Sequence, residues 1–508
     1  MQLSAVFFAL LAALISACSG HVDELSGEEL VAKYCTSCHL APIPEQLPKE
    51  SWPFVLKWMG NYLGFRDTGG ALHGIVNIDI IPDKPLISAG DFSKIESYLV
   101  SKSEPQSEMF RSNREYELTD AFHAEYPIKD IAKGEFITLV RHDPHSGYSF
   151  VGYGTENNKR LEVYNRQFRK IADYKMKSEP IHLVPLNPGF RLSLIGDFSY
   201  DKGEGEVFEV RPGRFGRLDV RHLITGYNRM TQSLAADFNQ DGRTDLLVVG
   251  FGQGHIGRTS VVHQLPNGRY GDEIIFSNGS GSLCAEVRDF DGNGYPDIML
   301  LVAQEHQELL LFLNQGNDRY EKKLLHKEFA GFGYNHFTLA DVNGDDKIDI
   351  VTSNGNNMEI TEVPLKPHHG IRILLNQGNL TWKEVYFFPL HGAIKSIAED
   401  FDRDGDIDIA AIAFYPNWDA EHPTTFVYLR NTGDLTFKAS TLSKEHWGRW
   451  MVMDSGDVDG DGYQDLVLGA AYINKGIAPR YEDRYRVLAK ESQPLLFLYN
   501  NGGRHQKQ

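Results

Sequence analysis

The chain has 508 residues, with 69 acidic and 51 basic side chains and a formal net charge of −18. This length exceeds that of one ordinary core, so we expect two domains. The negative charge argues against nucleic-acid binding and against electrostatic attraction to anionic lipid. No stretch beyond the N-terminus is apolar enough to span a membrane.

The first 18 residues predict an export signal. Phe7 to Leu14 form an apolar core that is too short to span a bilayer, and Ile15-Ser16-Ala17-Cys18 follows it. These four residues resemble the lipobox of bacterial lipoproteins, in which the cysteine is acylated and becomes the mature N-terminus. Gln2 stands where such signals usually carry a basic residue, so an ordinary secretory peptide is the alternative. The resemblance implies a membrane lipoprotein anchored at Cys18 and facing the periplasm, and Ser19 favours the outer membrane.

Residues 24–105 predict a small all-α domain. Ser26 and Glu29 form a capping box that opens a helix, and Cys35-Thr36-Ser37-Cys38-His39 follows. C-x-x-C-H is the attachment signature of a c-type haem, in which Cys35 and Cys38 bind the vinyl groups and His39 ligates the iron. A zinc site or a redox C-x-x-C is the alternative, but the chain has no second cysteine pair to complete a zinc site.

A second amphipathic helix is expected from Asp91, with Phe92, Ile95, Tyr98 and Leu99 at helical spacing. A first helix that runs into C-x-x-C-H, and a last helix with an aromatic residue packed across it, resemble small monohaem cytochrome c domains. This resemblance implies one covalent haem c with a methionine as the sixth ligand. Met59 is the expected ligand and His73 is the alternative.

The cysteine count agrees with these assignments. Of the four cysteines, Cys18 is assigned to lipid, and Cys35 and Cys38 are assigned to haem. Cys284 lies in an apolar strand, where a small buried side chain is its expected role. No structural disulfide is expected, because each possible pair would take a cysteine from another role.

An Asp-rich segment recurs five times in residues 110–508. The first aspartates are 52, 52, 59 and 57 residues apart, and a short apolar strand lies on each side of every segment. The segments are Asp237–Asp245, Asp289–Asp297, Asp341–Asp349, Asp400–Asp408 and Asp457–Asp465. This period predicts a repeat architecture built from β-strands.

The spacing within each segment is typical of calcium coordination. Oxygen side chains stand at positions 1, 3, 5 and 9 and a backbone carbonyl is available at position 7, but the glutamate that an EF-hand needs at position 12 is missing. We therefore expect up to five Ca²⁺ ions and no EF-hand. The expected side-chain ligands are Asp237, Asn239, Asp241, Asp245, Asp289, Asp291, Asn293, Asp297, Asp341, Asn343, Asp345, Asp349, Asp400, Asp402, Asp404, Asp408, Asp457, Asp459, Asp461 and Asp465.

A loop of this kind between two strands resembles the FG-GAP/VCBS repeats of integrin-type β-propellers. The Lys366–Arg372 and Arg449–Asp454 stretches, with the long insertions between strands, look like bacterial proteins that fuse such propellers to a cytochrome. Two degenerate units at 136–164 and 181–210 precede the five regular ones, so we expect seven blades. The last blade lacks an outer strand, and Arg114–Leu118 is the segment expected to supply it.

The Asp loops occupy one face of such a propeller, and the long insertions occupy the other. Binding residues concentrate in long loops on a rigid scaffold. We therefore expect a cationic, aromatic-rimmed funnel near the starts of the inner strands, although independent solvated or strand-capping side chains are the alternative. The residues assigned to this funnel are Arg229, His336, His391, Lys395, Arg449 and Trp450.

The expected fold is therefore a multidomain protein, with a small all-α cytochrome c domain followed by an all-β seven-bladed propeller. The expected function is haem-mediated electron transfer, with a calcium-stabilised propeller that docks a redox protein or a small-molecule electron donor or acceptor. A periplasmic oxidoreductase with its substrate in the funnel, such as a haem-linked dehydrogenase, is one alternative. An adhesion or glycan-binding propeller is the other. An electron carrier is favoured over a complete enzyme because no nucleophile elbow, phosphate loop or HExxH motif appears.

Overall fold

The computed structural model describes residues 24–36, 40–69, 76, 78, 81–109, 115–155, 158–197, 202–213, 217–253, 256–304, 306–357, 365–473 and 476–502. The chain divides into two compact units. The small unit takes residues 1–105 except 38–40 and 46–48, and the large unit takes the rest.

The small unit is helical, with α2 (Gly27–Tyr34), the 3-10 turn η1 (Pro44–Gln46), α3 (Trp52–Tyr62) and α4 (Ala89–Lys102). The predicted capping box is present, because the Ser26 hydroxyl accepts a hydrogen bond from the Glu29 amide while the Glu29 carboxylate accepts one from the Ser26 amide. The predicted apolar face of the last helix is also confirmed, since Ile95 and Leu99 are fully buried. The short helix α5 (Gln106–Met109) opens the large unit.

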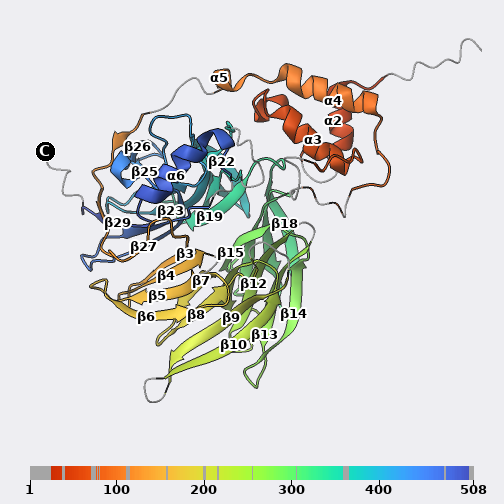
Figure 1. Cartoon of the computed structure of the whole chain (residues 1–508). Coiled ribbons are helices and arrows are strands. Elements are labelled where there is room, and N and C mark those ends of the chain that lie inside the picture. The colour runs from red at the N-terminus through yellow and green to blue at the C-terminus, as the bar shows by residue number, and fades with distance from the viewer. Residues whose placement is uncertain are drawn as a thin grey trace, which may run out of the picture. The chain divides into compact units, whose positions relative to one another are not determined.

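The large unit is a β-propeller of seven sheets (Figure 1). The first three blades follow the chain. Blade one contains β3 (Ile137–Asp143), β4 (Tyr148–Thr155), β5 (Asn158–Tyr164) and β6 (Lys170–Lys175). Blade two contains β7 (Pro180–Pro185), β8 (Phe190–Leu194), β9 (Gly205–Pro212) and β10 (Leu218–Tyr227). Blade three contains β11 (Met230–Ala236), β12 (Asp245–Gln253), β13 (Ile256–Gln264) and β14 (Tyr270–Ser277).

The remaining blades repeat this order. Blade four contains β15 (Ser282–Arg288), β16 (Asp297–Val302), β17 (Glu308–Asn314) and β18 (Tyr320–Lys327). Blade five contains β19 (Tyr334–Ala340), β20 (Asp349–Asn354), β21 (Gly370–Gly378) and β22 (Thr381–Pro389). Blade six contains β23 (Ala393–Glu399), β24 (Asp408–Ala413), β25 (Phe426–Asn431) and β26 (Phe437–Thr441). Blade seven contains β27 (Trp450–Gly456), β28 (Asp465–Ala470) and β29 (Leu495–Asn500).

The prediction of seven blades is confirmed, but the predicted closing strand was wrong. Blade seven takes its fourth strand from β2 (Phe122–Glu125), which pairs antiparallel with β29. The nearby β1 (Glu117–Leu118) instead runs parallel to β26 and adds a fifth strand to blade six. Phe122, the first residue of β2, is only 6% exposed, whereas Leu118 in β1 remains 64% exposed.

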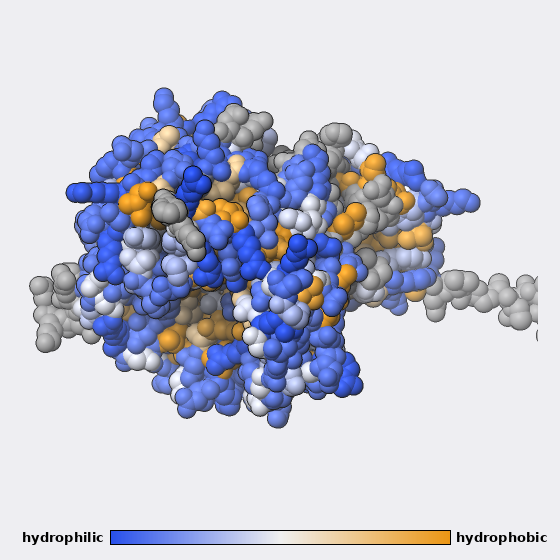
Figure 2. Space-filling view, turned by 90° about the horizontal axis from the view of Figure 1, so that it is seen from below, coloured by the Kyte–Doolittle hydropathy of each residue, from blue (hydrophilic) through white to orange (hydrophobic). Residues whose placement is uncertain are grey.

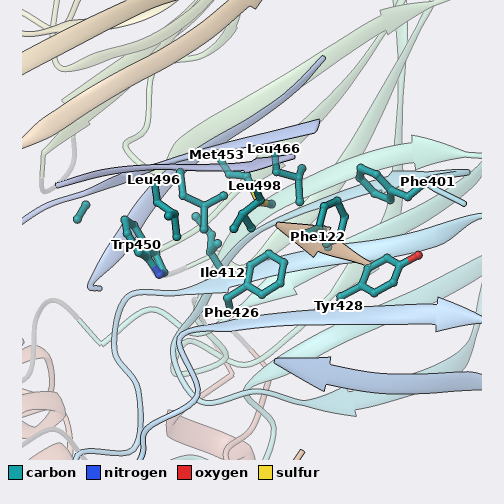
Figure 3. Close-up of a cluster of buried hydrophobic side chains, with 13 residues drawn as sticks. Phe122, Phe401, Ile412, Phe426, Tyr428, Trp450, Met453, Leu466, Leu496 and Leu498 are labelled. Carbon is teal, nitrogen blue, oxygen red and sulfur yellow. The ribbon is translucent and has the colours of Figure 1, made fainter. Parts of the chain in front are cut away.

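The apolar core lies between neighbouring blades. Figure 3 shows the cluster between blades six and seven, in which Phe122, Phe401 and Tyr428 lie together with aliphatic residues of β28 and β29. The Phe122 ring packs edge-on against Phe401 and Tyr428, with ring centroids 5.6 Å and 5.2 Å apart. The closing strand is therefore fixed by side-chain packing as well as by its ladder.

The surface in view in Figure 2 is mainly hydrophilic, with apolar side chains scattered among polar ones. No described helix is long and apolar enough to cross a membrane.

Candidate functional site

The proposed haem-attachment motif begins where α2 ends. Cys35 is the residue that follows the last turn of α2, and its amide donates a hydrogen bond to the Val31 carbonyl. Burial raises the pKa of its thiol to about 11. A reactive or metal-binding thiolate needs a lowered pKa, so this environment does not favour a free redox cysteine. Cys18, Cys38, His39 and His73 lie outside the described residues.

Helices α2 and α4 cross closely because Gly27 has no side chain. A Cβ atom at position 27 would lie 2.5 Å from the Tyr98 Cβ and 2.5 Å from the Lys94 carbonyl oxygen. Real Cβ atoms do not approach other atoms so closely, so this crossing requires glycine. Tyr98 of α4 therefore packs on the start of α2.

Met59 lies on α3 and is half-buried. Its neighbour Trp58 has a buried indole N–H with no hydrogen-bond acceptor among the described residues. Gly60 follows, where an added Cβ would lie 3.2 Å from the Phe92 ring. Several apolar side chains of the small unit are only partly covered, namely Phe54, Val55, Phe65 and Phe92.

The five Asp loops share one backbone conformation. In each loop the carboxylate at position 1 accepts hydrogen bonds from amides at positions 5 and 6, or 4 and 6; Asp237, for example, accepts from Asp241 and Gly242 at 3.0 Å and 2.8 Å. Positions 4 and 6 have positive φ in every loop, which explains the frequent glycines there. The residues at these two positions are Gln240, Gly242, Gly292, Gly294, Gly344, Asp346, Arg403, Gly405, Gly460 and Gly462.

The aspartate at position 9 ties each loop to the end of the blade's third strand. Asp465, for example, accepts from the Asn500 amide at 2.8 Å and from the Val458 amide at 2.8 Å. The Asn500 side chain then donates to the Phe401 carbonyl of the preceding blade at 2.8 Å. This explains why an asparagine recurs at the end of the third strand. Burial raises the pKa of Asp297 to about 6, and it raises the pKa values of Asp408 and Asp465 to about 7.

Carboxylates converge in three of the five loops. Their oxygens lie within 4.8 Å of one another in the groups Asp289/Asp291/Asp297, Asp400/Asp402/Asp404 and Asp457/Asp459/Asp465. In the other two loops a basic residue at position 7 pairs with the carboxylate at position 5: Arg243 with Asp241, and Lys347 with Asp345. These two loops therefore already hold a positive charge beside an expected ligand, and so does the loop 400–408, where Arg430 Nε lies 3.2 Å from Asp402 Oδ2.

The predicted funnel is contradicted at Arg449. This side chain is fully buried, and its guanidinium donates to the Phe414 carbonyl at 3.0 Å and to the Ile473 carbonyl. It also stacks over the Phe414 ring, 3.7 Å from the centroid. Burial lowers the pKa of Arg449 to about 10. Arg449 thus holds two loops in place from within the core and presents no charge to a funnel.

Trp450 is also buried, with 1% of its surface exposed. Its ring lies in the cluster between blades six and seven, near Ile412 and Phe426 (Figure 3). The remaining residues of the predicted funnel have different surroundings. Arg229 stacks over the Phe251 ring at 4.7 Å, and His391 lines a small cavity with His369 that has room for about one water molecule. His336 and Lys395 lie on the first strands of neighbouring blades, β19 and β23.

We expect Arg449→Ala to lower the free energy of unfolding by about 3 kcal/mol, because it leaves a cavity and removes the donors of two carbonyls. Thermal and denaturant unfolding measure this loss. Arg319→Ala, at an exposed position of blade four, is the matched control and should change stability by less than about 0.5 kcal/mol. Equal stability of the Arg449 and Arg319 variants would contradict the structural role.

The insertion between β28 and β29 contains a helix that sequence analysis missed, α6 (Glu482–Glu491). Tyr485 and Leu488, three residues apart and both buried, were the available signal. A recess of about 540 Å³ lies beside α6, and Tyr126, Lys444, Trp447, Val487 and Glu491 are among the residues that line it.

Comparison with known proteins supports the repeat assignment. Residues 237–300, 289–352 and 400–468 match the FG-GAP-like repeat, so each Asp loop lies in a matched segment. Among solved structures, BBS1N in complex with ARL6DN is 10% identical and has a TM-score of 0.43, covering 74% of this chain and 96% of that one. The Dos1 propeller is 7% identical with a TM-score of 0.40, covering 72% and 78%. A periplasmic gluconolactonase from Pseudomonas aeruginosa is 13% identical with a TM-score of 0.39, covering 61% and 86%. The large unit is thus a seven-bladed β-propeller that carries FG-GAP-like repeats.

Proposed function

We propose that this protein is an exported, membrane-anchored c-type cytochrome whose propeller docks an electron-transfer partner. The observation that carries the proposal is Cys35-Thr36-Ser37-Cys38-His39 at the end of α2, in a unit where α4 crosses α2 at Gly27. When bound, a haem supplies reversible one-electron transfer at iron. Cys35 and Cys38 would attach it, and His39 and Met59 would be the axial ligands, with His73 as the alternative to Met59.

The residues described in the small unit fit a large apolar cofactor. Phe54, Val55, Phe65 and Phe92 are only partly covered, so an apolar ring would bury them further. The buried indole N–H of Trp58 lacks an acceptor among the described residues, and a haem propionate is an anionic acceptor. A unit of this size also has a small core of its own, and a covalent cofactor would enlarge it.

The role of Met59 is tested by spectroscopy. We expect Met59→Ala to remove the sulfur-to-iron charge-transfer band of the oxidised protein and to lower the reduction potential. Met109→Ala, on α5, is the matched control and should leave both unchanged. If Met59→Ala has no effect and His73→Ala changes the spectrum, the iron has two histidine ligands and the Met59 assignment is wrong.

Electron transfer itself is tested with the intact protein. The reduced protein should transfer one electron per chain to a soluble high-potential cytochrome c in a stopped-flow measurement. A haem that is reduced by a sugar, alcohol or other substrate without a protein partner would instead support the oxidoreductase alternative. That substrate would bind elsewhere than at Arg449 and Trp450, because both are buried.

The second part of the proposal is that calcium stabilises the propeller. The loops 289–297 and 457–465 are the strongest candidates, because their carboxylates converge and no described basic side chain forms an ion pair with them. In the other three loops Arg243, Lys347 and Arg430 pair with expected ligand aspartates. A chelator should lower the melting temperature, since each site occupied at 100 times Kd adds about 2.7 kcal/mol to stability. Asp291→Ala should shrink this chelator effect more than the matched change Asp241→Ala. Identical melting curves with and without chelator, in protein loaded with calcium, would refute the role.

Calcium affinity should fall as the pH is lowered from 8 to 6. The pKa values of Asp408 and Asp465 are raised to about 7 in the metal-free loops, so calcium must displace protons there. These raised pKa values mean that the folded metal-free protein binds more protons than the unfolded chain. Their contribution therefore stabilises the metal-free fold at low pH and is lost as the pH rises through about 7. Calorimetric titration at several pH values measures the proton release.

Export and lipidation follow from the first 18 residues alone. We expect Cys18→Ala to release the protein from the membrane fraction and to abolish labelling by radioactive palmitate. Labelling that persists in the variant would refute the anchor at Cys18.

Saccharide binding is the second candidate function, and the recess beside α6 favours it. Tyr126, Trp447 and Leu488 supply aromatic and apolar surface, and the charged groups of Lys444 and Glu491 line the same recess. Arg484 is engaged by the carbonyls of Trp418, Ala420 and Glu421, so its role is to fix the wall.

This second function is tested by filling the recess. Val487 is 54% exposed on α6, so Val487→Trp would occupy the recess without disturbing the core. Fluorescence titration with maltose and cellobiose should show binding that Val487→Trp weakens at least tenfold. Val385→Trp, at a 44% exposed position of β22, is the control. Absence of saccharide binding to the unmodified protein would refute this function without affecting the cytochrome proposal.

A further inference from the structure

Two of the five Asp loops accept a hydrogen bond from the Asp loop of the preceding blade. The side-chain amide of Gln240, at position 4 of the loop in blade three, donates to the Gly294 carbonyl in blade four at 2.9 Å. The guanidinium of Arg403, at position 4 of the loop in blade six, donates to the Gly462 carbonyl in blade seven. The acceptor is the carbonyl at position 6 in both cases. We refer to this contact as the inter-blade hydrogen bond.

The backbone at position 4 does not favour a long side chain. The φ angle is 59° at both Gln240 and Arg403. Glycine adopts such a conformation without strain, whereas a residue with a Cβ adopts it rarely. The other three loops have glycine at this position, and no described atom would lie within 4 Å of an added Cβ at Gly292, Gly344 or Gly460. The two loops without glycine are thus the two whose side chain reaches the next blade.

The two loops that accept the inter-blade hydrogen bond also share a tyrosine at position 7. The rings of Tyr295 and Tyr463 pack on glycines that follow the third strand, since an added Cβ at Gly316 or Gly502 would lie 2.9 Å or 3.1 Å from them. Arg403 also stacks over the Tyr463 ring, 4.2 Å from its centroid. In blades five and six no described atom would lie within 4 Å of an added Cβ at the equivalent glycines, Gly378 and Gly433.

The same two loops have the carboxylate arrangement best suited to a cation. In the loops 289–297 and 457–465 the carboxylates at positions 1, 3 and 9 converge, and no described basic side chain forms an ion pair with them. The loop 400–408 differs, because its converging carboxylates are those at positions 1, 3 and 5. Its aspartate at position 9, Asp408, accepts a hydrogen bond from the Tyr428 hydroxyl at 2.6 Å instead.

The inter-blade hydrogen bond holds the peptide group that precedes the expected backbone ligand. In blade seven the Gly462 carbonyl accepts from Arg403, and the Tyr463 amide of the same peptide group donates to the Asp461 carboxylate at 2.9 Å. The equivalent amide in blade four donates to the Asn293 side chain at 2.8 Å. The next carbonyl along the chain is that of position 7, which is the expected ligand. Because this peptide group is held from both sides, less conformational entropy is lost when an ion binds.

We propose that Gln240 and Arg403 are positioning residues for calcium in the following blade, so that each of two strong sites is built from two consecutive blades. This inference rests on the calcium role proposed above and narrows it to two strong sites per chain, in the loops 289–297 and 457–465. Both residues act through the peptide group that precedes the ligand carbonyl. The loop of one blade thereby controls the calcium affinity of the next.

Two neutral amides at position 403 separate the reach of the side chain from its charge. Arg403→Gln can reach the Gly462 carbonyl, because Gln240 reaches the equivalent carbonyl from the equivalent position. Arg403→Asn is one methylene shorter, yet asparagine adopts a positive φ more readily than glutamine. We therefore expect Arg403→Asn to bind calcium about threefold to tenfold more weakly than Arg403→Gln. Its stability towards urea in the presence of a chelator should be no lower, which excludes a merely structural effect.

Calorimetric titration of the full chain with calcium measures these affinities. The unmodified chain should show two strong sites. An Asp291→Ala background removes the site in the loop 289–297, so that the effect of the Arg403 variants on the loop 457–465 is measured alone. Gln377→Asn, at an exposed position of blade five, is the control and should leave both affinities unchanged.

The outcomes separate this inference from the calcium role itself. Equal calcium affinities of Arg403→Asn and Arg403→Gln would overturn the inference and leave the calcium role intact. Five equally strong sites in the unmodified chain would do the same. Absence of calcium binding to the unmodified chain would overturn both.

Discussion

Replacing both Cys35 and Cys38 with alanine is expected to abolish covalent haem. With the wild-type sequence, expression alongside a cytochrome c maturation system should yield one haem that remains attached in denaturing electrophoresis. The double variant should lose the haem stain almost completely, because thioether bonds form only at these two thiols. Retention of covalent haem by the variant would refute the cytochrome proposal.

The structure offers a matched control for this experiment. Cys284→Ala removes the cysteine on β15. This cysteine is half-buried, and it is remote in sequence from the proposed haem-attachment motif. It should keep the full haem stain. Limited proteolysis separates a local effect from a global one. The double variant should be cut faster within residues 24–105, where haem would complete the core, while the melting temperature of the propeller stays unchanged.

Phe122→Ala is expected to lower the free energy of unfolding of the propeller by about 3–5 kcal/mol. The ring is 6% exposed and packs on Phe401, Phe426 and Tyr428 with centroid distances of 5.2–6.4 Å. Its removal leaves a cavity and also loosens β2, whose pairing with β29 closes the circle of blades. Loss of this ring therefore affects the closure of the whole propeller.

Urea unfolding followed by circular dichroism measures the effect. Leu118→Ala is the matched control, because Leu118 lies in the nearby strand β1 but is 64% exposed. Leu118→Ala should lower the free energy of unfolding by less than about 0.5 kcal/mol. If Leu118→Ala were the more destabilising change, the closing strand would be β1 and the assignment of β2 would be wrong.

Local sequence signals predicted the parts of the fold that depend on nearby residues. The Ser26/Glu29 capping box located the start of α2, since both partners lie within one helical turn. The spacing of the Asp loops predicted the number of regular blades, because each loop is a self-contained turn between two strands. The loop conformation itself repeats in all five copies, which reflects hydrogen bonds within nine consecutive residues.

Contacts between distant residues were beyond the reach of these signals. A basic residue beside an aromatic one at the start of an inner strand can line a solvent-filled funnel, or it can be buried in the core. Arg449 is in the core because the carbonyls of Phe414 and Ile473, from two separate loops, meet at its guanidinium. The same limit applies to the closing strand, since 114–118 and 122–125 are both short and lie close together in sequence. Phe122 settles this choice through its contacts with residues about 300 positions away in the chain.

The amino-acid sequence alone therefore predicted the Asp loops and the blade count, and it also carries the segments on which the proposed export signal and haem attachment rest, because each is encoded in short contiguous segments. The tertiary structure was needed to show that Arg449 and Trp450 are buried and that three Asp loops gather their carboxylates. Those features depend on how neighbouring blades pack, and packing brings together side chains from strands that are separated by a whole repeat or more. The charge, hydropathy and residue spacing of a single segment do not predict these contacts between blades.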